Sequence, residues 1–119
     1  MYRRNTFGMK SMISVSKLTS IFKPFKLDEL RICNCNITQQ SVEELLKNLI
    51  EKSFLTKLSL VEANLSDKSL LLLIEFIKNN KYIDTIDISW NNIFPKNFRP
   101  FLEYLKDCRK IKSLNLSWN

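Results

Sequence analysis

Residues 83–93 read IDTIDISWNNI, and a stretch of this kind returns along the chain at a constant spacing. Related strings stand at residues 27–37 (LDELRICNCNI) and 55–65 (LTKLSLVEANL), and a shortened one, IKSLNLSWN, stands at 111–119. Aliphatic side chains fill the same three places in all four strings: Leu27, Leu55, Ile83 and Ile111; then Leu30, Leu58, Ile86 and Leu114; then Ile32, Leu60, Ile88 and Leu116. Self-similarity at a fixed period predicts a stack of equal units.

Each unit changes its hydrophobic period from that of a strand to that of a helix. The second and third aliphatic places alternate with other residues, as in a strand. The later half of each full unit carries an apolar stripe with helical i, i+3, i+4, i+7 spacing: Val42, Leu45, Leu46 and Leu49; Leu70, Leu73, Ile74 and Ile77; Phe98, Phe101, Leu102 and Leu105. Thr38 and Ser66 are the predicted N-caps, and Pro95 and Pro100 suit the turn and first helical turn of the third unit. The sequence therefore predicts an α/β fold, with a parallel sheet and an outer layer of helices.

The four strings resemble the leucine-rich repeat signature, L-x-x-L-x-L-x-x-N/C-x-L, and a 28-residue period with a full helix resembles its ribonuclease-inhibitor-like subtype. The resemblance covers residues 27–119, with repeats starting at 27, 55 and 83 and a truncated one at 111. It implies a right-handed βα solenoid with the sheet on the concave face and the helices on the convex face. It also implies that Asn91 and Asn119 bond to backbone groups where the chain leaves the strand, with Cys35 in the corresponding place. The asparagines that follow these places suit left-handed turn geometry: Asn36, Asn64 and Asn92.

Residues 1–26 are predicted to be a separate basic leader. They hold six bases and no acid, whereas the remaining 13 bases face all 12 acids. A basic, acid-free segment with several serines has the composition of a mitochondrial transit peptide. We expect a basic leader that caps the fold or stays loose, and the alternative is a segment that directs mitochondrial import or contacts RNA. For the capping form we expect residues 1–10 to be irregular and a helix to bury Leu18, Ile21, Phe22 and Phe25.

The composition disfavours an enzyme. Histidine is absent and glycine occurs once, at Gly8, so neither a histidine base nor a glycine-rich phosphate loop can be built. Three cysteines without histidine do not complete a four-ligand zinc site. We therefore predict no catalytic residue, metal, cofactor or small-molecule substrate. The longest apolar run, residues 70–74, is too short to span a membrane. A cytoplasmic location is expected, with a mitochondrial one as the alternative.

Outward-facing positions of the predicted strands, which line the expected concave face, are the candidate binding residues, because the core does not use them. The selected residues are Arg31, Lys57, Glu62, Asp87, Trp90, Asn115 and Trp118. Trp90 and Trp118 should be neighbours, about 4.8 Å apart, and exposed tryptophans are enriched at binding hot spots. Alternatively, both rings fold over the turn, or a further unit covers them. The predicted function is a non-enzymatic protein–protein interaction module, whose partner the sequence does not name. The alternative function is a structural or targeting subunit that uses the basic leader.

Two further expectations concern the C-terminal part of the chain. Basic residues near the end of the third helix have a structural role there, and the outward rows lack interleaved aromatic and basic residues, so nucleic-acid binding is disfavoured. These bases are Lys106, Arg109, Lys110 and Lys112. Leu114 and Leu116 have no helix after them in the sequence. We therefore expect a fragment of a longer array, or self-association through the last strand.

Overall fold

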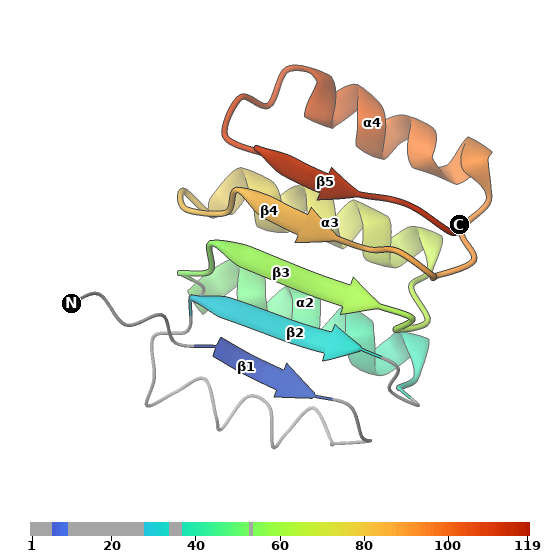
Figure 1. Ribbon diagram of the computed structural model, residues 1–119, viewed down its shortest axis with the longest axis horizontal. Helices are drawn as coiled ribbons and strands as arrows, with labels where there is room; N and C mark the ends of the chain where they lie inside the picture. The colour runs from blue at the N-terminus through green and yellow to red at the C-terminus, as the bar shows by residue number, and fades with distance from the viewer. Residues whose placement is uncertain (1–5, 10–27, 34–36, 53) are drawn as a thin grey trace.

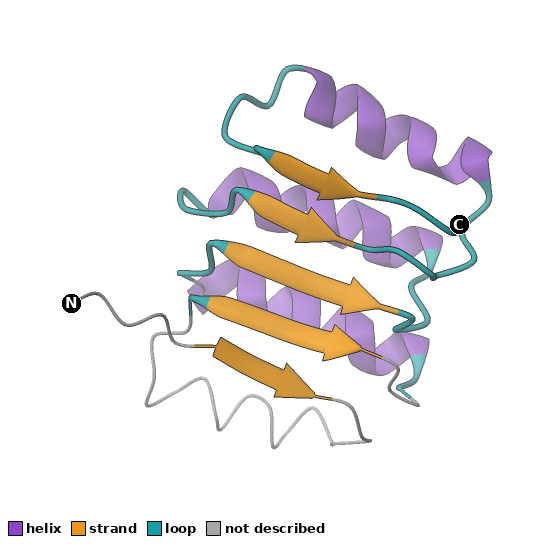
Figure 2. Ribbon diagram, in the orientation of Figure 1, coloured by secondary structure: helices purple, strands orange, loops and turns teal. Residues whose placement is uncertain are grey.

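The computed structural model describes residues 6–9, 28–33, 37–52 and 54–119, which form an α/β fold. Five parallel strands make one sheet in chain order: β1 (Thr6–Met9), β2 (Glu29–Cys33), β3 (Lys57–Val61), β4 (Thr85–Asp87) and β5 (Ser113–Asn115). The helices of the described part are α2 (Gln39–Lys52), α3 (Asp67–Asn79) and α4 (Arg99–Lys106), with a 3-10 turn η1 (Pro95–Phe98) before α4. They lie along one face of the sheet, and no described helix covers the other face (Figures 1 and 2).

From β2 to β5, paired residues occupy equivalent positions of successive repeats. Leu30 pairs with Leu58, Leu58 with Ile86, and Ile86 with Leu114, so the prediction that these four lie side by side is confirmed. The first three are at most 1% exposed. Because successive side chains of a strand point to opposite faces, the residues between these aliphatic ones are left on the face without helices.

The prediction that residues 1–10 are irregular is wrong for Thr6–Met9, which form strand β1. Phe7 pairs with Leu30 and Met9 with Ile32, so two more apolar residues stand in the register of the inward positions. The step along the sequence from β1 to β2 is shorter than the repeat period that joins β2 to β3. A search at the fixed period therefore misses this strand. The predicted capping helix over residues 18–25 lies outside the described residues.

Helices α2 and α3 begin at the predicted caps. The Thr38 Oγ1 accepts a hydrogen bond from Ser41 N at 3.1 Å, just before α2. Ser66 and Ser69 form a capping box, since each side-chain oxygen accepts a hydrogen bond from the other residue's backbone N–H. The predicted stripes of both helices are buried against the sheet: Val42, Leu45, Leu46 and Leu49 in α2, and Leu70, Leu73, Ile74 and Ile77 in α3.

Helix α4 is shorter and buries less of its stripe. Pro95 opens η1 and Pro100 lies in the first turn of α4, as predicted. Phe98 and Phe101 are buried, but Leu102 is 45% exposed, which corrects its predicted place in the core. The helix lies at one end of the row of helices, where no further described helix packs against that side (Figure 1).

No helix among the described residues is both long and apolar enough to cross a membrane.

Candidate partner-binding surface

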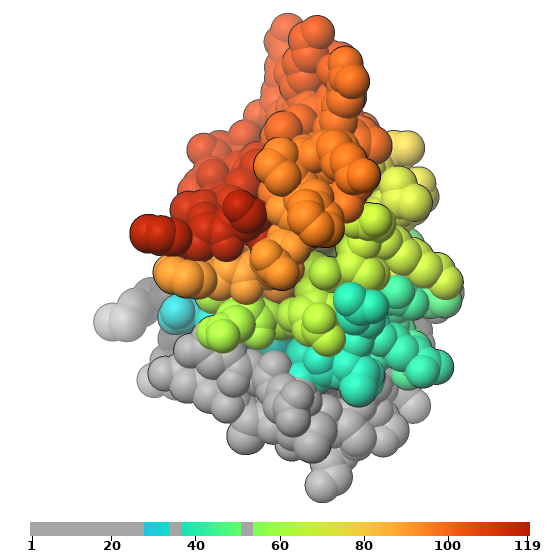
Figure 3. Space-filling view, turned by 90° about the vertical axis from the view of Figure 1, so that its right-hand side faces the viewer, coloured from blue at the N-terminus to red at the C-terminus, as the bar shows by residue number. Residues whose placement is uncertain are grey.

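The turns that follow β3, β4 and β5 carry Glu62, Trp90 and Trp118 in the same backbone conformation. Their φ angles are 51°, 61° and 59°, in the left-handed region. The prediction that these residues are outward strand positions is wrong, because β3 ends at Val61, β4 at Asp87 and β5 at Asn115. Figure 3 shows this side of the molecule, where the exit turns follow one another and the last residues, in red, protrude.

The side chain of Asn91 holds two of these turns in place. Its Nδ2 donates to the carbonyl oxygens of Leu60, Ile88 and Ser89 at 2.7, 2.9 and 3.1 Å. Its Oδ1 accepts from the backbone N–H groups of Ala63 at 2.9 Å and Leu65 at 3.3 Å. The amide thus joins the exits of β3 and β4, and Asn91 is 8% exposed.

Asn119 makes the same set of bonds one unit later. Its Oδ1 accepts from Asn91 N at 2.9 Å and Ile93 N at 3.2 Å, and its Nδ2 donates to Ile88 O, Leu116 O and Ser117 O. The predicted backbone bonding of both asparagines is therefore confirmed. Cys35, their expected counterpart, and Asn36 lie outside the described residues. Asn64 and Asn92 have left-handed φ angles of 58° and 55°, as predicted.

The indole rings of Trp90 and Trp118 stack on one another. Their centroids are 4.7 Å apart and their planes differ by 14°. Trp90 is 52% exposed and Trp118 is 69% exposed, so the predicted adjacency is confirmed and both rings remain open to solvent. A bulky residue with positive φ is a backbone outlier that costs on the order of 1–3 kcal/mol. Two strained backbones therefore carry one exposed aromatic stack.

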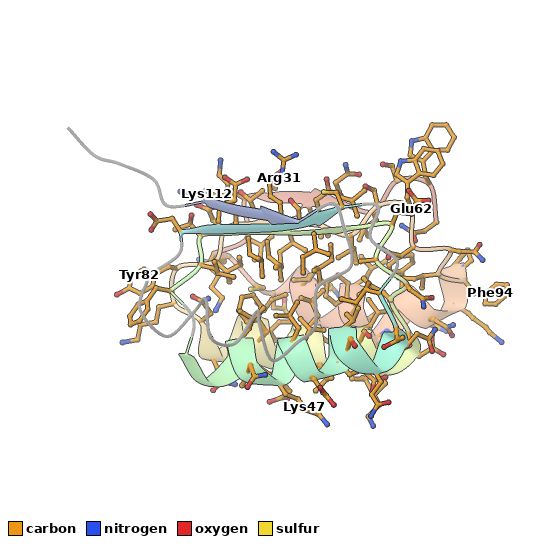
Figure 4. All side chains as sticks on the ribbon, turned by 90° about the horizontal axis from the view of Figure 1, so that it is seen from below. Arg31, Lys47, Glu62, Tyr82, Phe94 and Lys112 are labelled. Atoms are coloured by element: carbon orange, nitrogen blue, oxygen red, sulfur yellow. The ribbon has the colours of Figure 1, made fainter. Side chains whose placement is uncertain are left out.

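Glu62 stands next to Trp90 in the row of turn residues that runs from Glu62 through Trp90 to Trp118. Glu62 N donates to Ser89 O at 3.1 Å, and Trp90 N donates to Ser117 O at 3.1 Å, so equivalent bonds link consecutive turns. Glu62 is exposed, at the edge of the sheet where the strands end (Figure 4). We call Glu62, Trp90 and Trp118 the exit-turn column.

The four other selected residues lie on the face of the sheet without helices. Arg31 is exposed, and its row across the sheet continues through Ser59 and Asp87 to Asn115 (Figure 4). Lys57 lies in a different row, between Glu29 and Thr85 near the starts of the strands. The selected residues therefore divide into the exit-turn column, a middle row and one lysine apart from both.

Asp87 and Asn115 are held by serines that sequence reasoning missed. The Asp87 Oδ1 accepts from Ser89 N at 3.0 Å and Ser89 Oγ at 2.7 Å. The Asn115 Oδ1 accepts from Ser117 N at 3.0 Å and Ser117 Oγ at 2.6 Å. An Asp or Asn shortly before a serine is typical of such local bonds. The recurrence of this pair one repeat later is the sequence signal from which the bonds could have been predicted. These bonds fix the backbone just before Trp90 and just before Trp118.

A second exposed aromatic pair, also missed, lies at the edge where the strands begin. Phe54 and Tyr82 have ring centroids 6.3 Å apart and are 49% and 56% exposed. They occupy equivalent positions of successive repeats, so comparison of such positions beyond the apolar ones would have found them. Their rings are tilted by 31° and share no stack like that of the tryptophans.

The end of the third unit carries a surface depression lined by Glu103, Tyr104, Asp107, Cys108, Arg109 and Lys110. Burial raises the pKa of Tyr104, and Cys108 and then Glu75 raise it further. The phenol therefore keeps its proton at neutral pH and is no base. Lys110 donates to the carbonyl oxygens of Ile77 and, at 2.6 Å, Asn80, so it satisfies the end of α3. No cluster among the described residues could hold a metal ion.

The chain was compared with models of known protein families and with curated proteins, and neither comparison gives a match.

Proposed function

We propose that the chain is a leucine-rich repeat protein of the ribonuclease-inhibitor-like subtype and acts as a non-enzymatic protein–protein interaction module. The regular pairing of equivalent positions from β2 to β5 supports a solenoid, because each strand–helix unit contacts its neighbours in the order of the chain. The sheet face that no described helix covers supports a binding role, because exposed side chains such as that of Arg31 stand on it (Figure 4).

The single observation that carries the proposal is the exposed stack of Trp90 and Trp118 on left-handed backbone. Burying a large ring is the usual reason to keep tryptophan, and here about half or more of each side chain stays in water. Strained conformations persist where the surroundings impose them, and they cluster at functional sites. A protein partner that covers the stack would bury apolar area that the fold itself leaves exposed.

The structural explanations for the tryptophans receive less support. Rings folded over the turn would be largely buried, and exposures of 52% and 69% disfavour that reading. A further unit next to β5 would cover one side of Trp118, but Trp90 lies between Trp118 and Glu62 in the column. Part of Trp90 would therefore still face solvent.

We also propose that the protein performs no catalysis and needs no cofactor, and that it resides in the cytoplasm. The alternative remains a subunit whose basic residues 1–26 direct mitochondrial import or contact RNA. Strand β1 lies within this segment and pairs with β2. A transit peptide is removed after import, whereas β1 is part of the sheet, and this difference favours retention of the segment.

Affinity capture with the intact chain, followed by mass spectrometry, tests the proposal. Trp90→Gly and Trp118→Gly remove the rings while a glycine accepts the left-handed turn, and Glu44→Gln on exposed α2 surface is the control. Proteins retained by the wild type and by Glu44→Gln, but lost from both glycine variants, are the expected result. Equal capture by all four chains would contradict the proposal.

A further inference from the structure

We infer that the exit-turn column binds an arginine side chain presented by the protein partner. This inference rests on the proposed function and names the chemistry of the ligand at the same surface. The column combines one carboxylate, that of Glu62, with a stacked pair of indoles. An arginine matches both, because its planar guanidinium stacks on aromatic faces and pairs with carboxylates.

The geometry places the two recognition elements side by side. One face of the Trp90 ring lies against Trp118, with centroids 4.7 Å apart. Because Glu62 N bonds to Ser89 O as Trp90 N bonds to Ser117 O, Glu62 stands one strand spacing, about 4.8 Å, from Trp90 on the side away from Trp118. All three residues share a left-handed φ, so their backbones present the side chains in similar directions.

The local charge selects a cation. Residues 61–65, 89–93 and 117–119, which form the exit turns, contain Glu62 and no basic residue. Within the described part of the chain, no cation pairs with Glu62; the ion pairs there join Lys68 to Glu43 and Lys78 to Glu75. Asp87 adds a second carboxylate to the segment that leads into the Trp90 turn, where it accepts a hydrogen bond from Ser89 Oγ.

The same charges disfavour a nucleic acid at this edge. A phosphate backbone would meet Glu62 and Asp87 beside the rings, with no lysine or arginine in the turns to neutralise it. The overall charge of +7 opposes a basic ligand at long range, but at physiological salt such interactions are screened beyond about 8 Å. Contacts at the exit-turn column therefore determine whether it prefers a cationic or an anionic ligand.

Titration of the protein with the tripeptide Ac-Gly-Arg-Gly-NH2 tests the inference. The chain has two tryptophans, so its two indole N–H signals in a ¹H–¹⁵N NMR spectrum report on the column directly. We expect saturable shifts of both signals, weaker binding of the lysine peptide, and none of the citrulline peptide, which has the shape of arginine without its charge. Glu62→Gln should weaken binding of the arginine peptide about two- to fivefold, and Trp90→Gly by a similar factor.

Glu44→Gln is the matched control, because it removes an equal charge from α2 on the helical face. Glu62→Gly is a second variant that removes the carboxylate and suits the left-handed turn, so it should behave as Glu62→Gln does. Equal binding of arginine and citrulline peptides, unchanged binding by both Glu62 variants, or no response to arginine would overturn the inference. Shifts with an uncharged proline-rich peptide instead would overturn it and leave the proposed function standing.

Discussion

The Oδ1 of Asn119 accepts a hydrogen bond from the backbone N–H of Asn91 at 2.9 Å, and the Oδ1 of Asn91 accepts the corresponding bond from Ala63 at the same distance. Each asparagine therefore holds the exit turn of the unit before it as well as its own. Trp90 precedes Asn91 and Trp118 precedes Asn119, so this ladder sets the position of both rings.

Asn91→Ala is expected to destabilise the protein by at least about 3 kcal/mol, because it leaves several buried backbone groups without a partner. Asn119→Ala removes equivalent bonds from a half-buried site, where water can replace some of them, and should cost about 1–2 kcal/mol. Urea unfolding followed by circular dichroism measures both losses. Equal losses, or a loss below about 1 kcal/mol for Asn91→Ala, would argue against the ladder as the element that holds the turns.

Replacement of Trp90 by alanine and by glycine separates the ring from the backbone. Both variants lose the stacking with Trp118, about 0.5–1.5 kcal/mol. Only glycine escapes the left-handed penalty of about 1 kcal/mol, so Trp90→Gly should be more stable than Trp90→Ala. Thermal unfolding of the pair checks the order. A variant that fails to fold would show instead that the indole is structural.

The sequence predicts the strand register because the apolar positions keep their phase from Leu30 to Leu114. It also predicts the turn asparagines, whose amides have a known preference for such geometry. The left-handed conformation of Trp90 and Trp118 is not predictable from propensity, since bulky side chains avoid it. At these turns the hydrogen bonds of Asn91 and Asn119 determine the backbone conformation, and the tryptophans adopt it.

Three other misses have tertiary causes. Strand β1 is short and does not follow the repeat period. Its position is determined by its pairing with β2 and not by a pattern in its own sequence. Lys110 donates to the end of α3, which is distant in the sequence, and no local sequence pattern predicts that contact. The exposed face of Leu102 likewise depends on what packs beside α4 and not on its helical spacing.

The capping box of α3 predicts a local stability effect. Ser66→Ala removes the acceptor for Ser69 N and also the hydrogen bond that Ser66 Oγ donates to Glu43 Oε1 at 3.2 Å, which ties the start of α3 to α2. The loss should be about 1–2 kcal/mol. Ser113→Ala, an exposed serine at the start of β5, should change stability by less than about 0.5 kcal/mol. Denaturant titration of both variants compares them, and equal effects would contradict the role of the cap.

Within the described residues, β5 is the last strand of the sheet and has one unpaired edge, and we expect the chain as given to self-associate through it. Leu114 and Leu116 are half-buried, whereas Leu58 and Leu60, their counterparts in β3, are fully buried. The N–H of Ser113 donates to Asp84 O and the C=O of Asn115 accepts from Ile88 N. Because neighbouring residues of a strand alternate in direction, the backbone N–H and C=O of Leu114 point away from β4. We expect light scattering to show a mass that rises with protein concentration, and Ser113→Lys to suppress the rise, since a charged lysine on an edge strand opposes pairing. Ser59→Lys, on the internal strand β3, adds the same charge and should leave the association unchanged. A constant monomer mass at all concentrations, or equal suppression by both lysines, would contradict pairing through β5.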